Sequence, residues 1–262
     1  MKLFVILFEQ RSGSSHLVSL LNSHREIRAR GEVFDGKKKL HGPNVNNRIT
    51  AKPATVADYE RRITIDGHSI LDPEPKQCLA VIQDWITDPS AIFGFKFKFA
   101  KQVKLFPEVN RCLQELNDQI RVIVLKRDNL VRRALSHFNH QRLRLQTGKS
   151  NYRGNGKVMD PIQLDLDLFV KYVEHLASLR KQFFEWTATF SNTLHVEYEE
   201  LISDSGAVDR IQQFIGVQQV RPLTSRVVKA TSTRFDHAIE NYDLFHNRMI
   251  TEGFQEYLKR AA

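Results

Sequence analysis

Short apolar runs along the chain predict the strands of a buried sheet. The first is LFVILF at 3–8, and two further runs follow at 119–125 (QIRVIVL) and 192–197 (NTLHVE). Continuous apolar runs of this length are typical of parallel strands that are covered on both faces. At 92–99 (IFGFKFKF) phenylalanine alternates with lysine toward the end of the run, which predicts a strand with one buried face.

Between these runs, apolar positions recur every three or four residues, which is the spacing of one helix face. This spacing predicts helices at 16–24, 75–87, 108–117, 130–145, 165–189 and 198–216, a short one within 58–71 with a turn at 66–67, and one from 254. The stretch from 217 to about 236 lacks such a period and is predicted to be irregular. Strands that alternate with helices indicate an α/β fold, a three-layer sandwich around a central, mostly parallel sheet. Its ligand site is expected at the carboxyl ends of the strands.

The first predicted strand leads into a turn of small polar residues. Arg11 follows Glu9 and Gln10, and then come Ser12, Gly13, Ser14 and Ser15, before the helical pattern that begins at His16. A strand, a small turn and a helix direct free backbone N–H groups toward an anion. The stretch from Leu3 to Phe34 therefore predicts a phosphate-binding loop.

Composition adds a preference for anionic ligands. The chain has 262 residues, and its 39 Lys and Arg exceed its 30 Asp and Glu, which gives a net charge of +9. Cys78 and Cys112 have no metal-binding spacing and are expected to be reduced thiols. The apolar run at 3–8 is too short for a signal peptide and meets charged residues, and no run approaches the ~20 residues that a bilayer requires. We therefore expect a cytoplasmic protein.

The loop lacks the sequence of two common nucleotide-binding motifs. A nucleoside triphosphatase needs GxxxxGK followed by Ser or Thr, and a dinucleotide fold needs GxGxxG, whereas Gly13 is the only glycine in this turn. These differences disfavour a kinase-like phosphotransferase, the first alternative. The second alternative is a non-enzymatic protein that binds RNA or another polyanion, for which the net charge and the GKKK run at 36–39 argue. The scattered basic residues do not form the stripe with interleaved aromatics that such a protein needs.

Several motifs, taken in order, resemble those of sulfotransferases. QRSGSS at 10–15 is similar to the loop of carbohydrate sulfotransferases that binds the 5′-phosphosulfate, and RDNLVRRALS at 127–136 is similar to the family's motif for the 3′-phosphate. HVEYEEL at 195–201 resembles a recurrent segment of the family. LNSH at 21–24, GEVF at 31–34 and IENY at 239–242 resemble segments of bacterial members that act on nodulation factors or lipopolysaccharide.

The resemblance implies a P-loop nucleotide-kinase-like sulfotransferase fold in a single domain, 1–262. The donor is then 3′-phosphoadenosine 5′-phosphosulfate, used without a metal. The unmatched region 35–91 is expected to form a lid that selects the acceptor, and the C-terminal segment 217–250 is expected to cover the donor. The acceptor is a carbohydrate or a small-metabolite alcohol, and the residues do not decide between them. Neither nucleic acid nor stable membrane insertion is expected.

The resemblance also assigns roles to individual residues. It implies that the donor is bound by Arg11, Ser12, Gly13, Ser14, Ser15, His16, Arg127, Ser136, Tyr198 and Arg234. Arg11 would also neutralise the charge that grows on the leaving phosphate during an in-line displacement. Glu32 is the candidate general base, and His68 and His41 are reserve bases. Lys96 is a further candidate for contact with the sulfonate, although a single lysine on a strand's polar face is usually solvated. Arg132 and Arg133 are expected to be solvated cations of a helix.

Overall fold

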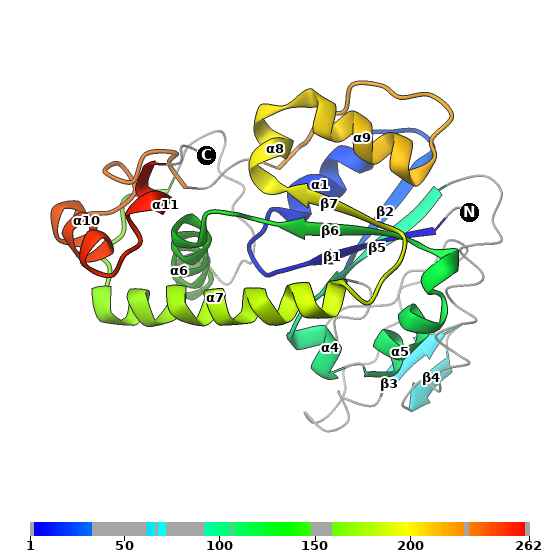
Figure 1. Ribbon diagram of the computed structural model, residues 1–262, viewed down its shortest axis with the longest axis horizontal. Helices are drawn as coiled ribbons and strands as arrows, with labels where there is room; N and C mark the ends of the chain where they lie inside the picture. The colour runs from blue at the N-terminus through cyan, green and yellow to red at the C-terminus, as the bar shows by residue number, and fades with distance from the viewer. Residues whose placement is uncertain are drawn as a thin grey trace.

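Five parallel strands form the centre of the computed structural model (Figure 1). The structure describes residues 3–32, 62–65, 68–71, 92–105, 107–147, 159–227 and 231–259. In the sheet the strands have the order β2-β5-β1-β6-β7, and every neighbouring pair is parallel. Their bounds are β1 Leu3–Phe8, β2 Ile27–Glu32, β5 Ile92–Lys98, β6 Arg121–Lys126 and β7 Thr193–Glu197.

Helices cover both faces of this sheet, which confirms the predicted three-layer α/β fold (Figure 1). One face packs against α1 Ser14–Leu21, α8 Tyr198–Ser203 and α9 Ser205–Ile215 through a core that includes Phe4, Ile6, Leu17, Leu201 and Ile211. The other face packs against α4 Lys101–Leu105, α5 Pro107–Glu115 and α7 Leu166–Thr187 through Val5, Leu7, Phe95, Leu113 and Phe183. The 3-10 helix η1, Asn117–Gln119, leads from α5 into β6. None of the helices within the described ranges has the length and apolar character needed to cross a bilayer.

A second group of helices lies beyond the carboxyl edge of the sheet. It consists of α6 Leu130–Thr147, α10 Tyr242–Thr251 and α11 Gln255–Lys259, packed with the first half of α7 (Figure 1). Their shared core contains Val131, Phe169, Phe235, Phe245 and Met249. This packing brings the C-terminal part of the chain against α6, next to the expected ligand site.

The structure corrects several predictions about individual elements. β5 is buried on both faces, not on one, because helices cover both faces of the sheet in which it lies between β2 and β1. β2 was missed, since IRARGE at 27–32 has few apolar residues, and it forms an edge strand of the sheet. The single helix predicted at 198–216 is two helices, because Asp204 has an extended backbone and caps the second one with its side chain. α10 lies in a stretch for which no element was predicted.

A separate antiparallel hairpin replaces the short helix predicted within 58–71. Its strands are β3 Arg62–Ile65 and β4 His68–Leu71, and they pair with each other and not with the five-stranded sheet. Apart from these two strands, the region 35–91 lies outside the described residues. This part of the chain includes the predicted turn at 66–67 and the predicted helix at 75–87. His41 and Cys78 belong to this part of the chain.

The strand order determines where a ligand can bind. β1 lies between β5 and β6, and the chain leaves β1 toward the α1 face and leaves β6 toward α6 and the α7 face. Loops that diverge in this way leave a crevice at the carboxyl ends of the two strands, which is where open α/β sheets bind ligands. The loop predicted to bind phosphate follows β1, and Arg127 follows β6 directly.

Candidate functional site

The loop between β1 and α1 has a backbone that only a few residue types adopt readily. Arg11 has a φ of 65° and Gly13 a φ of 85°, both in the left-handed region. α1 begins immediately after Gly13, whose carbonyl accepts hydrogen bonds from the N–H groups of His16 and Leu17. The positive end of the α1 dipole therefore faces the crevice, together with the hydroxyls of Ser14 and Ser15. This geometry agrees with the predicted anion-binding loop.

Tyr198, the first residue of α8, joins this loop to the end of β6. A Cβ atom added to Gly13 would lie 2.1 Å from Cδ2 of Tyr198, so the ring occupies the space that any larger residue at 13 would need. The guanidinium carbon of Arg127 lies 4.7 Å from the centre of the same ring, a cation–π contact. His16 meets the ring edge-on at 6.4 Å between centroids. Tyr198 thus contacts three of the residues predicted to bind the donor.

Lys96 links the loop to the candidate base. Its Nζ lies 3.3 Å from Oγ of Ser14 and 3.3 Å from Oγ of Ser15, and it lies 3.7 Å from Oε1 of Glu32. Lys98, two residues later on β5, lies 3.1 Å from Oε2 of Glu32. The expectation that Lys96 is solvated is wrong, because only 7% of the residue is exposed once β2 covers the outer side of β5.

The two predicted phosphate motifs meet directly. Nε of Arg11 donates a hydrogen bond of 3.1 Å to Oγ of Ser136, on α6, so the loop after β1 contacts the helix after β6. Arg127 is almost fully buried, and its Nε lies 3.7 Å from Oε1 of Glu199. The backbone N–H groups of Asp128 and Asn129 also face the Glu199 carboxylate, at 3.1 and 3.5 Å. The arrangement places the two junctions that were predicted to bind anions side by side.

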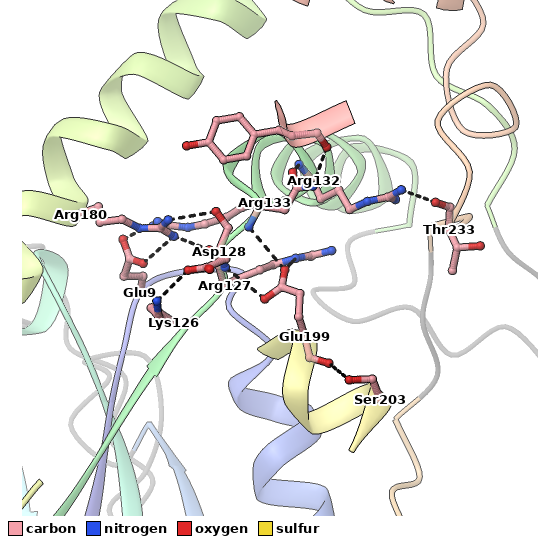
Figure 2. Close-up of polar contacts among 12 residues, drawn as sticks. Glu9, Lys126, Arg127, Asp128, Arg132, Arg133, Arg180, Glu199, Ser203 and Thr233 are labelled. Carbon is pink, nitrogen blue, oxygen red and sulfur yellow. Dashed lines mark hydrogen bonds and ion pairs between the residues drawn. The ribbon is translucent and has the colours of Figure 1, made fainter. Parts of the chain in front are cut away.

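A buried ion cluster holds these two junctions together (Figure 2). Glu9 is 1% exposed and accepts hydrogen bonds from Nη1 of Arg133 and, at 3.3 Å, from Nη2 of Arg180. Arg133 also donates to the carbonyl of Gln10 at 2.8 Å. Arg180, from α7, donates in addition to the carbonyls of Arg127 and Asp128. Arg133 is therefore not the solvated cation that was expected, and it binds the residue next to Arg11.

Positive charge exceeds negative charge at the centre of the site. Burial, and then the nearby charge of Arg127, lowers the pKa of Arg11. Burial also lowers the pKa of Arg127, against the opposing effect of Tyr198 and Glu199. Arg132, likewise expected to be solvated, is buried, and burial followed by the charge of Arg127 lowers its pKa to about 10. The charge of Arg127 thus adds to burial in lowering the pKa of both Arg11 and Arg132, and such perturbed groups are typical of functional sites.

Arg234 and His68 are the remaining predicted site residues. Arg234 is largely exposed and forms an ion pair of 2.5 Å with Asp236. His68 begins β4 of the separate hairpin. Among the described part of the chain, no group of three or more His, Cys, Asp or Glu side chains has the arrangement of a metal site.

His137 is a member of the site that the sequence did not indicate. Its ring stacks on that of Tyr172 at 4.4 Å between centroids, which joins α6 to α7. Burial, and then the positive charges of His140, Arg11 and Arg133, lowers the pKa of His137 from 6.5 to about 4. Glu9 and Arg180 were missed as well, since they are ordinary charged residues until the fold brings them together. The one available signal was Glu9 itself, a carboxylate directly after a fully apolar strand.

The substitution Glu9→Gln is expected to lower the free energy of unfolding by about 3–5 kcal/mol, because it leaves two buried guanidinium groups without their carboxylate. Chemical denaturation measures this change. Glu200→Gln is the matched control, since Glu200 pairs with Arg210 at 3.1 Å on the surface and a glutamine there still suits the capping box. Its effect should stay below about 1 kcal/mol. Equal losses in the two variants would contradict a structural role for the cluster.

The lowered pKa of His137 predicts a dependence of stability on pH. The unfolded chain binds a proton at this imidazole near pH 6.5, whereas the folded chain binds it only near pH 4. Its contribution is therefore complete above about pH 6.5 and is lost as the pH falls toward about 4. His137→Gln should flatten the fall in unfolding free energy across this interval, measured by denaturation at each pH. The surface variant His237→Gln should retain the wild-type slope, and equal slopes in all three proteins would contradict the prediction.

Comparison with known proteins identifies the family. A search of curated proteins finds no significant match. Among solved structures, the sulfotransferase from Alicyclobacillus acidocaldarius is similar, with 13% sequence identity, a TM-score of 0.47, and coverage of 99% of this chain and 96% of that chain. A model of the sulfotransferase family matches residues 4–221, a range that contains the loop after β1, Lys96, Arg127 and Tyr198. The chain belongs to the sulfotransferase family.

Proposed function

We propose that this sulfotransferase moves the sulfuryl group of 3′-phosphoadenosine 5′-phosphosulfate to an acceptor hydroxyl by in-line displacement. The observation that carries the proposal is the position of Lys96. Its ammonium group lies between the Ser14 and Ser15 hydroxyls on one side and the Glu32 carboxylate on the other. Lys96 thus connects the loop that would hold the leaving phosphate with the candidate base. The sulfuryl group would be transferred between this loop and the acceptor hydroxyl beside the base.

The residues present suit a donor that carries phosphate at two positions. The buried Oγ of Ser12 has no hydrogen-bond partner among the described residues, so it has capacity for a ligand. Nε of Arg127 makes no hydrogen bond there either, and it reaches the Glu199 carboxylate only at 3.7 Å. The 5′-phosphosulfate is held by the loop 11–15 with His16, and the 3′-phosphate by Arg127 and Ser136. Tyr198 lies between the two groups, where it contacts both Gly13 and Arg127. Arg234 is a further ligand of the donor, from the C-terminal segment 217–250.

The chemistry requires a base and a stabilised leaving group. Glu32 takes the proton of the acceptor hydroxyl as its oxygen attacks sulfur. The bond between sulfur and the 5′-phosphate oxygen breaks, and adenosine 3′,5′-bisphosphate leaves with the electron pair. Arg11 and Lys96 neutralise the negative charge that grows on the bridging oxygen, an effect that is strong in a site from which water is excluded. Lys98 orients Glu32 through the contact at 3.1 Å.

The acceptor belongs to the carbohydrates or the small-metabolite alcohols, and region 35–91 selects it. We place the whole chain, 1–262, in one catalytic domain. The reserve base His68 lies on a hairpin outside the main sheet, whereas Glu32 ends β2, beside Lys96 in the sheet. This register is the reason for preferring Glu32.

The donor is tested with the wild-type protein and sulfur-labelled 3′-phosphoadenosine 5′-phosphosulfate, screened against glycans, lipid-linked sugars and small alcohols. We expect transfer of label to at least one hydroxyl compound, with release of adenosine 3′,5′-bisphosphate and without added metal. Parallel reactions with ATP and Mg²⁺ should give no phosphoryl transfer. Phosphoryl transfer in place of sulfuryl transfer would overturn the proposal.

Glu32→Gln should retain the affinity for adenosine 3′,5′-bisphosphate and lower turnover by about 10²–10⁴-fold, the usual contribution of a general base. Calorimetry measures binding, and the labelled assay measures turnover. Glu26→Gln is the matched control, because Glu26 precedes the same strand at its opposite end and binds the N–H of Gln218. It should leave turnover near that of the wild type. Full turnover in Glu32→Gln would assign the base to another residue, His68 first.

A further inference from the structure

Arg132 lies on the first turn of α6, five residues after Arg127, and is buried. Its Nη2 donates to the carbonyl of Thr233, and its guanidinium carbon lies 4.1 Å from the centre of the Phe235 ring. Nε is buried and has no hydrogen-bond partner among the described residues. Nη2 and one face of the guanidinium group therefore contact the C-terminal segment, at Thr233 and Phe235. Nε can still donate a hydrogen bond to a ligand.

The charge of Arg127 acts on Arg132, and Arg127 pairs with the Glu199 carboxylate. Figure 2 shows the two side chains extending in the same direction, with Glu199 next to Arg127. Glu199 acts on the charge of both guanidinium groups, and it also faces the N–H groups of Asp128 and Asn129. Among the described residues, Glu199 is the one carboxylate whose charge acts on both buried cations, which leaves a net positive charge. Such an excess is costly unless a further anion binds.

We propose that Arg132 is a second guanidinium ligand of the donor's 3′-phosphate, beside Arg127. This rests on the proposed function, because it assumes a nucleotide with a 3′-phosphate. A phosphate monoester carries close to two negative charges at neutral pH, and paired guanidinium groups bind it with charge-assisted hydrogen bonds. Arg132 would at the same time fasten residues 231–235 over the nucleotide, since Thr233 and Phe235 contact it directly.

The experiment removes the 3′-phosphate from the ligand as well as the arginine from the protein. Calorimetry measures the dissociation constants of adenosine 3′,5′-bisphosphate and adenosine 5′-monophosphate. The dissociation constant of the monophosphate divided by that of the bisphosphate reports the contribution of the 3′-phosphate alone. In Arg132→Gln this ratio should fall about tenfold to hundredfold, the loss expected for one hydrogen bond to a charged group. Arg132→Lys keeps a cation and an aliphatic stem against Phe235, and it should lose less. A wild-type ratio in both variants would overturn the inference.

Two controls separate direct binding from a structural effect. Arg142→Gln removes an arginine of the same helix that also donates to backbone carbonyls, those of Asp160 and Pro161, and it should leave the ratio unchanged. Arg132→Gln is also measured in an Arg234→Gln background. If Arg132 binds the phosphate itself, Arg132→Gln should lower the ratio of dissociation constants in this background as well. No change of the ratio in this background would show that Arg132 acts only by placing Arg234. A wild-type protein without preference for the bisphosphate would instead contradict the proposed function.

Discussion

The site depends on the buried ion pairs of the Glu9 carboxylate. This carboxylate receives Arg133 from α6 and Arg180 from α7, and these two guanidinium groups bind the carbonyls of Gln10, Arg127 and Asp128. The backbone after β1 and the backbone after β6 are therefore both linked to the Glu9 carboxylate through these guanidinium groups. Burying three charges is expensive, and the cost is offset in part because Glu9 pairs with both guanidinium groups, which also donate to three backbone carbonyls. In return, the peptide before Arg11 is held in place, which stabilises the left-handed conformation of Arg11.

The rigid cluster allows the neighbouring arginines to remain incompletely paired. Arg133 and Arg180 share Glu9, whereas Arg11 donates to the neutral Ser136 hydroxyl, and Arg127 stacks on Tyr198 and approaches the Glu199 carboxylate only to 3.7 Å. Neutral partners orient a guanidinium group without cancelling its charge. The protein thus contains two kinds of buried arginine next to each other, one in close ion pairs with Glu9 and one with neutral or more distant partners. Their difference follows from the partners and not from burial, since Arg127 and Arg133 are both almost inaccessible to solvent.

Local patterns were sufficient to predict part of this arrangement. The strand at 3–8, the loop at 11–15 and the helix after it are contiguous, so their geometry follows from apolar spacing and small residues. β2 and the hairpin were not predicted, because Arg28 and Arg30 hide the strand pattern in one and the strands of the other are only four residues long. The burial of Lys96, Arg132 and Arg133 could not be predicted either. Each is a polar residue on a strand or helix whose neighbours come from distant parts of the chain, so only tertiary packing decides whether it meets solvent.

Lys96 shows how a neighbouring strand can supply a lysine that the sequence of the loop itself does not contain. The loop has Arg11 and no lysine at the start of α1, yet an ammonium group reaches Ser14 and Ser15 from the neighbouring strand. Its position depends on the pairing of β1 with β5, in which Ile6 faces Lys96 and Phe8 faces Lys98. A slip of one residue would turn both lysines to the opposite face and place Phe95 and Phe97 beside the loop and Glu32. The buried phenylalanines of β5, which fill the core on that opposite face, hold this register. The packing of the core therefore sets the distance between the phosphate loop and the candidate base.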